Sequence, residues 1–209
     1  MNNIPQLPPI LDFNSNTNTG TLFDTRDGQS YPVVKIGKQI WLAENFRYLP
    51  SIKDKGDKYE NSWVYKNNTA YLDLHYGRFY DWDTAMNIAP EGWKLPNNQD
   101  FKELIDFIIK DNKLNVEKVG SYLKSVNGWE LCDGIVNNDK YGFNAKPAGY
   151  RSNTSNYFHN AGTSANFWSA TKISGINVNS WYLNYYNEVF NDYSDNKCYG
   201  FNVRLIKDI

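Results

Sequence analysis

Hydrophobic and polar positions alternate along this chain with changing periods, and these changes delimit its predicted elements. A turn signal at Asp27 and Gly28 precedes short segments containing Val, Ile and Trp, which fill residues 31–42 on either side of Gly37. This pattern predicts a β-hairpin. Further strands are predicted at residues 167–170, 180–185 and 200–206, with a shorter one around Phe143 that Pro147 and Gly149 close.

A spacing typical of an α-helix begins after the amide-rich segment at residues 96–100. Four apolar residues then recur at helical spacing: Phe101, Leu104, Ile105 and Ile108. An apolar face behind a capping segment predicts a helix that packs on the core. A shorter helical patch is predicted at residues 77–86, with Phe79, Trp82 and Met86 on one face.

The N-terminal segment shows neither the strand-like nor the helix-like spacing of apolar residues. Residues 1–22 are rich in Asn, Thr and Pro, which predicts an extended arm or tether through which the chain could form oligomers. One folded domain is predicted over residues 23–209. Within it, residues 50–74 carry Gly, Lys, Asp and Asn between isolated aromatic residues and predict a long loop.

Composition supports a sizeable core and excludes two classes of partner. Aromatic residues make up 16% of the 209 residues, while the formal charge is -1 and neither sign forms a long run. We therefore predict no binding to nucleic acid. Apolar stretches such as residues 104–109 are far shorter than the roughly 20 residues that span a bilayer, so no membrane insertion is predicted. Residues 1–13 lack the features of a secretory signal, so we expect none in this chain.

Five sequence blocks follow one another in order: YPVVKIGKQIWLAEN at residues 31–45, YGRFYDWDTAM at 76–86, GWKLP at 92–96, FWSAT at 167–171 and GFNVR at 200–204. Together with YGF at 141–143 and PAGYR at 147–151, they resemble the Fibrobacter succinogenes major paralogous domain. This family is abundant in surface proteins and lipoproteins of Bacteroidetes and Fibrobacteres. The resemblance covers roughly residues 23–209.

The GWKLP block and the late FWS segment are also similar to the formylglycine-generating and C-type-lectin-like group. The resemblance implies an α+β, C-type-lectin-like fold, in which small twisted antiparallel sheets and two helices leave a long irregular loop region on one face. The family often has Cys where this chain has Ala89 and Leu205, which puts the family disulfide in doubt. Cys132 and Cys198 are left as a pair of their own or as two free thiols.

Few residues carry catalytic chemistry. An enzyme of the formylglycine-generating type would need a close cysteine pair or a metal held by several His, whereas this chain has two distant cysteines and only His75 and His159. We therefore predict that the chain is not an enzyme. Each His is expected to be a surface or hydrogen-bonded loop residue.

Two groups of carboxylates could offer oxygen ligands to Ca²⁺. The first is Asp81 with Asp83, and the second is Asp192 with Asp195 near Glu188. Each group also has an ordinary structural explanation, because Asp at a helix start meets the helix dipole and Asp in an Asn- and Ser-rich segment forms turns. We predict no cofactor, with a structural calcium ion as the open alternative.

The aromatic residues separate into a predicted core and a predicted contact surface. Five Trp residues are expected to fill the core: Trp41, Trp82, Trp93, Trp129 and Trp168. Residues 150–200 instead contain ten Asn, seven Tyr and seven Ser among 51 positions, a composition typical of a binding surface. The predicted binding residues are Tyr157, Tyr182, Asn184, Tyr186, Asn187, Asn191, Tyr193 and Asp195, of which Tyr186 and Tyr193 are expected to be the most exposed.

The leading functional prediction is a non-enzymatic, surface-displayed recognition domain that binds a protein or glycan on a cell surface. A phage virion or tail-associated protein is the alternative, and residues 182–195 look like the product of a retroelement that diversifies Asn codons. In both cases the domain faces the outside, on a cell surface or a virion. A formylglycine-generating enzyme has the least support.

Overall fold

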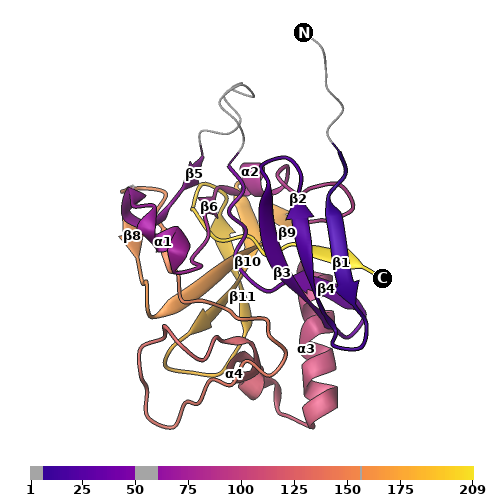
Figure 1. Ribbon diagram of the computed structural model, residues 1–209. Helices are drawn as coiled ribbons and strands as arrows, with labels where there is room; N and C mark the ends of the chain where they lie inside the picture. Colours follow the sequence, from indigo (N-terminus) through magenta and orange to yellow (C-terminus); the bar gives the residue numbers. More distant parts are fainter. Residues whose placement is uncertain (1–6, 50–60, 156) are drawn as a thin grey trace.

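Small antiparallel sheets and a few helices build the chain, which the computed structural model describes over residues 7–49, 61–155 and 157–209 (Figure 1). The strands are β1 (Ile10–Asn14), β2 (Thr19–Asp24), β3 (Gln29–Ile36), β4 (Gln39–Leu42), β5 (Ser62–Trp63), β6 (Phe79–Tyr80), β7 (Tyr150–Arg151), β8 (Phe158–His159), β9 (Ser164–Ser174), β10 (Asn177–Asn184), β11 (Asn191–Asn196) and β12 (Ile206–Asp208). The helices are α1 (Ala70–Asp73), α2 (Trp82–Ala85), α3 (Asn98–Asn112) and α4 (Val119–Leu123), with 3-10 turns η2 (Tyr65–Asn67) and η3 (Val116–Lys118). The architecture is α+β.

The largest sheet contains five strands in the order β1-β2-β3-β4-β12, and each neighbouring pair is antiparallel. The predicted hairpin over residues 31–42 is confirmed as β3 and β4. Gly37 adopts a φ of 63° in the turn between them, a conformation that residues with a Cβ rarely adopt. Strand β12 closes the sheet by pairing with β4, where Ile206 lies opposite Trp41.

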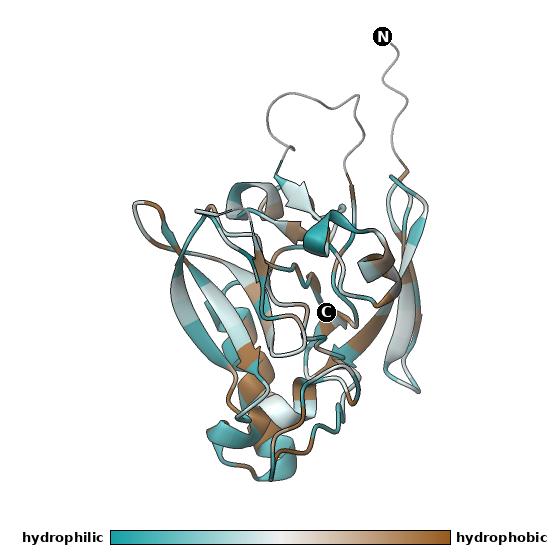
Figure 2. Cartoon of the chain, turned by 90° about the vertical axis from the view of Figure 1, so that its left-hand side faces the viewer, coloured by the Kyte–Doolittle hydropathy of each residue, from teal (hydrophilic) through white to brown (hydrophobic). Residues whose placement is uncertain are grey.

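A second sheet of three strands, in the order β11-β10-β9, lies across the molecule from the first. Figure 2 shows these two sheets on opposite sides, with hydrophobic segments between them. Helix α3 connects the two through Phe101, whose ring centroid lies 5.3 Å from that of Trp41 in β4 and 5.2 Å from that of Trp181 in β10. The main core therefore sits between the sheets and the inner face of α3.

Helix α3 begins where the sequence predicts. Asn97 is its N-cap, and its side-chain oxygen accepts hydrogen bonds from the backbone N–H groups of Gln99 at 2.7 Å and Asp100 at 3.1 Å. The Asp100 carboxylate in turn accepts from the backbone N–H of Asn97 at 2.7 Å, which completes a capping box. The apolar residues at helical spacing, Phe101, Leu104, Ile105 and Ile108, are all buried, as predicted.

The five predicted core Trp residues are confirmed, since Trp41, Trp82, Trp93, Trp129 and Trp168 are all buried. Their polar N–H groups are also used. The indole N–H of Trp168 donates to the backbone oxygen of Tyr80 at 2.6 Å, and that of Trp82 donates to the backbone oxygen of Ser169 at 2.8 Å. These rings therefore connect distant segments without leaving buried donors unpaired.

The prediction of an extended arm over residues 1–22 is wrong for its second half. Residues 10–14 and 19–22 belong to β1 and β2, and β2 pairs in full with β3 of the predicted domain. Leu22 is completely buried, while Leu11 and Phe13 pack against the same cluster. Burial of these scattered apolar side chains outweighs the polar composition of the segment. Residues 1–6 lie outside the described residues, so the expected tether and its role in oligomers remain predictions.

Several other boundaries differ from the predictions. Residues 50–60 of the predicted loop lie outside the described residues, and the remainder contains β5, η2 and α1. The helical patch at 77–86 is divided into β6 and the shorter α2, and Met86 is 41% exposed, so it does not share a buried face with Phe79 and Trp82. The strand predicted at residues 200–206 is shorter, because β12 starts only at Ile206. Residues 201 and 202 form isolated bridges instead of a continuous strand.

The strand predicted around Phe143 is absent, because residues 141–144 form turn and irregular backbone. Strands β9 and β10 contain most of the predicted segments 167–170 and 180–185, although β10 ends at Asn184. Among the residues that the structure describes, no helix is long and apolar enough to span a bilayer.

Candidate functional site

The candidate site lies on the three-stranded sheet, whose register decides which side chains share a face. Tyr182 of β10 pairs with Asn166 of β9 on one side and with Asn191 of β11 on the other. Ser180, two residues earlier on β10, pairs with Tyr193. Paired residues point to the same face and successive residues alternate between faces. Tyr182, Asn166 and Tyr193 therefore lie together on one face of the sheet.

The opposite face of this sheet is closed by the core. Trp181 and Leu183 of β10 and Phe167 of β9 point to it and are buried. The indole N–H of Trp181 donates to Asn98 Oδ1 at the start of α3, at 3.0 Å. Helix α3 thus covers this face and fixes the sheet. On the Tyr182 face, Trp168 and Val178 are buried in the second core cluster, so only the part around Tyr182 and Tyr193 is left to form a contact surface.

A pocket of about 270 Å³ opens on the Tyr182 face. Its wall, which we call the tyrosine pocket, consists of Tyr150, Asn166, Tyr182, Tyr193, Asp195, Tyr199 and Phe201. The residues outside the sheet reach it because Arg151 and Gly200 exchange two backbone hydrogen bonds, each with an N to O distance of 2.9 Å. This bridge places β7 and residues 199–201 beside the sheet.

Aromatic rings form most of the pocket wall. Tyr182 and Tyr193 meet edge to face, with ring centroids 6.4 Å apart. In the second group, the ring centroid of Tyr150 lies 5.9 Å from that of Tyr199 and 6.1 Å from that of Phe201. Such edge-to-face pairs are a preferred geometry of aromatic rings, so the wall is stabilised by its own contacts.

Asp195 is the carboxylate of the pocket. Its Oδ2 accepts a hydrogen bond from the Ser180 hydroxyl. Burial raises the pKa of Asp195, and the Ser180 hydrogen bond offsets part of this shift. Burial also raises the pKa of Tyr150, with smaller contributions from Tyr199 and Asp195. Asp195 and Tyr150 both line the pocket, so the charge of Asp195 lies near the Tyr150 hydroxyl.

The structure brings together three of the predicted binding residues, Tyr182, Tyr193 and Asp195. Five others do not line the pocket: Tyr157, Asn184, Tyr186, Asn187 and Asn191. The expected exposure of Tyr186 and Tyr193 is confirmed by exposed fractions of 57% and 62%. Tyr157 is exposed beside β8, while Asn184 and Asn191 lie on the strands of the Tyr182 face.

Asn187 has a structural role instead. Its Oδ1 accepts a hydrogen bond from the backbone N–H of Val189 at 3.2 Å, and its backbone oxygen accepts one from the Lys124 ammonium at 2.5 Å. Lys124 is completely buried, and burial lowers the pKa of its ammonium group to about 8. The contact with Lys124 therefore satisfies a buried donor and orders the turn that contains Asn187.

Sequence reasoning missed four pocket residues: Tyr150, Asn166, Tyr199 and Phe201. Tyr150 and Tyr199 stand near the two ends of the Tyr-rich segment, so composition alone contained a signal for them. Asn166 precedes the buried Trp168 by two residues, and strand alternation places both on one face. Phe201 had no such signal, because its position depends on the bridge between Arg151 and Gly200.

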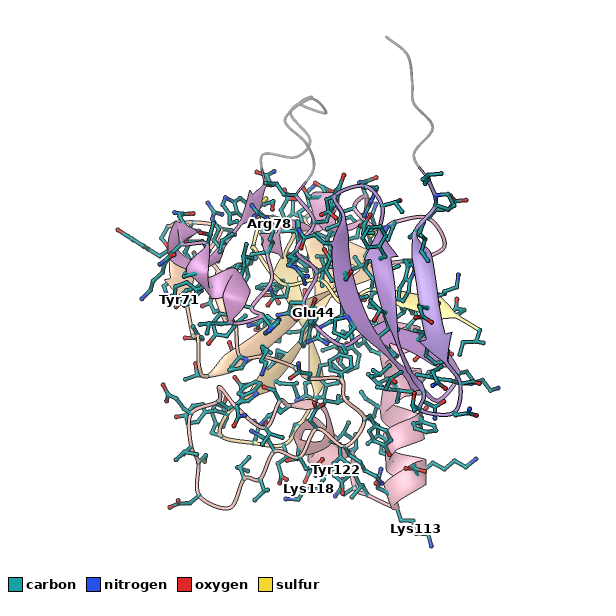
Figure 3. All side chains as sticks on the ribbon, viewed as in Figure 1. Glu44, Tyr71, Arg78, Lys113, Lys118 and Tyr122 are labelled. Atoms are coloured by element: carbon teal, nitrogen blue, oxygen red, sulfur yellow. The ribbon has the colours of Figure 1, made fainter. Side chains whose placement is uncertain are left out.

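The carboxylates considered for calcium have other partners. Asp81 is the N-cap of α2, where its side chain accepts from the backbone N–H of Thr84 at 2.9 Å. Asp83 pairs with Lys197 at 2.8 Å, and Glu188 pairs with Lys118, which Figure 3 labels at the lower end of the molecule. Within the described ranges, no group of three or more His, Cys, Asp or Glu side chains is placed to hold a metal ion.

The remaining residues with reactive chemistry are dispersed. Cys132 and Cys198 are both free, so the disulfide left open by the sequence does not form. His75 Nδ1 lies 3.0 Å from the carboxylate of Glu44, a residue near the centre of the view in Figure 3. His159 is exposed and its ring lies 5.4 Å from that of Tyr150. Both histidines therefore have ordinary surface or loop positions.

Comparison with known proteins adds a family to this description. The family model of the Fibrobacter succinogenes major domain matches residues 34–207. No curated protein and no solved structure matches the chain. The matched region contains every strand and helix from β4 to α4 and the whole wall of the tyrosine pocket. The chain therefore belongs to the Fibrobacter succinogenes major domain family.

Proposed function

We propose that this chain is a non-enzymatic recognition domain whose ligand enters the tyrosine pocket. The observation that carries the proposal is that aromatic side chains of β7, β10, β11 and residues 199–201 form one concave wall. Clefts that bind small ligands or parts of larger ones are mostly apolar and contain a small number of polar groups. The tyrosine pocket has this composition, with Asn166 and Asp195 as the polar side chains beside its tyrosine hydroxyls.

The rigid support of the pocket favours binding over another structural role. The sheet beneath the pocket is held on its opposite face by α3, through the contact between Trp181 and Asn98. Tyr193 is 62% exposed although its neighbours in the sheet are well ordered by pairing. An exposed aromatic side chain on a fixed strand can bind a ligand with little loss of conformational entropy.

The proposal includes a C-type-lectin-like fold and display at an outer surface. The fold is supported by small antiparallel sheets, α3 as the long helix and an irregular segment between α4 and β7. Outward display is supported by the family resemblance alone, and the partner would be a protein or glycan on another cell surface. The pocket geometry is equally compatible with display on a virion.

The proposal is tested by screening the purified chain on arrays of glycans and of cell-surface proteins. Binding of the parent, loss of binding in Tyr182→Ala and retention in Tyr157→Ala are expected, because Tyr157 is exposed but lies outside the pocket. If both variants still bind the partner, the contact surface lies outside the tyrosine pocket. If the parent protein binds no cell, glycan or protein, the proposed recognition function is wrong.

A further inference from the structure

The tyrosine pocket combines many aromatic ring faces with one carboxylate. Five rings contribute to its wall, from Tyr150, Tyr182, Tyr193, Tyr199 and Phe201. The face of an aromatic ring carries partial negative charge and attracts cations within about 6 Å of its centroid. Tyr199 and Phe201 stack on each other, with ring centroids 5.6 Å apart, so the faces offered to a cation come chiefly from Tyr150, Tyr182 and Tyr193. Asp195 adds a full negative charge beside them when ionised.

Among the described residues, no Lys or Arg side chain covers the rings of this region. Elsewhere, cationic side chains of the protein cover ring faces, as with Arg26 over Tyr48 at 4.0 Å and Lys172 over Trp82 at 5.3 Å. Nor does any described cationic group form an ion pair with Asp195. The rings and the carboxylate are open to a cation from outside.

Besides its tyrosine hydroxyls, the pocket has two polar side chains, and the fold already engages both of them. The side-chain amide of Asn166 already donates to the backbone oxygen of Gly149 at 3.2 Å and to the Ser164 hydroxyl oxygen at 3.0 Å. Its N–H groups are therefore engaged by the fold. The ionised Asp195 carboxylate can only accept, and it already receives the Ser180 hydroxyl, so donors to a sugar would have to come from the tyrosine hydroxyls.

A neutral apolar ligand fits the pocket poorly. It would satisfy the rings but would remove water from the Asp195 carboxylate without giving it a partner beyond the Ser180 hydroxyl, which is unfavourable. A cation with an apolar surface meets both requirements, since its methyl groups pack on the rings and its charge faces the carboxylate. The volume of about 270 Å³ suits such a head group rather than an entire large ligand.

We propose that the tyrosine pocket binds an alkylated ammonium group. This inference rests on the proposed recognition function and specifies the chemistry of its ligand. The same chemistry occurs in choline-type head groups and in N-methylated lysine side chains, so the two sources need separate arms in the test. In both cases the ring faces of Tyr182, Tyr193 and Tyr150 surround the methyl groups and Asp195 faces the charge.

The test compares choline with dimethylbutanol, its uncharged carbon analogue, by calorimetry and by NMR shifts of the full chain. Choline is expected to bind about tenfold more tightly than the analogue, because one good cation–ring interaction with a desolvated site contributes about that much. Asp195→Asn, which keeps an oxygen for Ser180, and Tyr182→Ala should each weaken choline binding about tenfold. The exposed Tyr186→Ala variant, outside the pocket, should bind like the parent.

Two further binding measurements use phosphocholine and a peptide with trimethyllysine. The one that binds more tightly identifies whether the natural ligand is a choline-type head group or an N-methylated lysine side chain. Equal binding of choline and its carbon analogue, or no effect of Asp195→Asn in a variant with the parent melting temperature, would overturn the ammonium inference. If a glycan shifts the pocket resonances and no ammonium compound does, the inference fails while the recognition function survives. If no compound shifts the pocket resonances and Tyr182→Ala leaves surface attachment unchanged, both the ammonium inference and the proposed recognition function fail.

Discussion

The two faces of the sheet formed by β9, β10 and β11 share the same strands but differ in what covers them. On one face, Trp181 stacks on Phe101 of α3, with ring centroids 5.2 Å apart, and both rings are buried. On the other face, Tyr182 and Tyr193 surround an open pocket. Around Tyr182 the two faces therefore differ in role, because side chains one residue apart point to opposite sides of the sheet. Farther along the strands, Trp168 and Val178 of the pocket face are buried in a second core cluster.

The largest effect is expected from a pair of neighbouring substitutions on β10. Trp181→Ala removes a buried ring with partners in α3 and should lower the free energy of unfolding by about 3 to 5 kcal/mol. Tyr182→Ala, one residue later, should cost far less because Tyr182 is only half-buried in the pocket wall. Chemical denaturation of both variants measures the difference. Equal losses would show that the two faces are not energetically distinct.

A second pair of substitutions divides the exposed tyrosines. Tyr193→Ala and Tyr186→Ala should both shift stability by less than about 0.5 kcal/mol, because the side chains are 62% and 57% exposed. Only Tyr193 lines the pocket, so only its loss should weaken ligand binding, by about 2 kcal/mol. Affinity and melting temperature are measured together for each variant. If Tyr186→Ala weakens ligand binding and Tyr193→Ala does not, the binding surface lies beyond the end of β10.

The helix that closes the core face provides the third prediction. Asn97→Ala removes the two side-chain hydrogen bonds that cap α3 and should cost about 1 kcal/mol. Urea denaturation measures this loss, and Lys102→Ala on the exposed side of the same helix is the control. Ligand binding should be unchanged when the variant is folded. Weaker binding at unchanged stability would indicate that α3 also adjusts the pocket.

The smallest effect concerns the pH dependence of stability. The pKa of Asp195 is raised in the folded state, so this state holds its proton to a higher pH than the unfolded chain does. The contribution of Asp195 to stability therefore falls as pH rises from about 4 through the raised pKa. Asp195→Asn should remove this dependence, so the variant gains stability relative to the parent as pH rises. Unfolding curves at several pH values test the sign, and a relative loss would contradict it.

Local patterns in the sequence were sufficient for the elements that depend on nearby residues. The cap at Asn97 and the apolar spacing that follows it define α3, and the segments around Gly37 define the hairpin of β3 and β4. Strand β1 escaped prediction because its five residues lie in a segment rich in Asn, Thr and Pro and become a strand only by pairing with β2. Local propensity could not indicate this partner.

Longer-range contacts explain the remaining differences. The strand predicted around Phe143 does not form because the Arg204 guanidinium binds the backbone oxygens of Phe143 and Asn144. Four of the seven pocket residues escaped prediction for a related reason. The segment containing Tyr199 reaches the sheet through backbone bonds to β7, and such pairings depend on the whole fold rather than on local residue types.

The position of β12 beside β4 has a consequence for synthesis of the protein. Residues 204–208 leave the ribosome after the rest of the domain, yet Ile206 pairs with Trp41 and the completely buried Arg204 donates to the backbone oxygen of Leu42 at 3.0 Å. Until these residues emerge, the nascent hairpin keeps an unpaired edge. The first sheet is therefore completed only after the rest of the domain has been made, and a chaperone that shields the edge of β4 until then would protect the growing chain from aggregation.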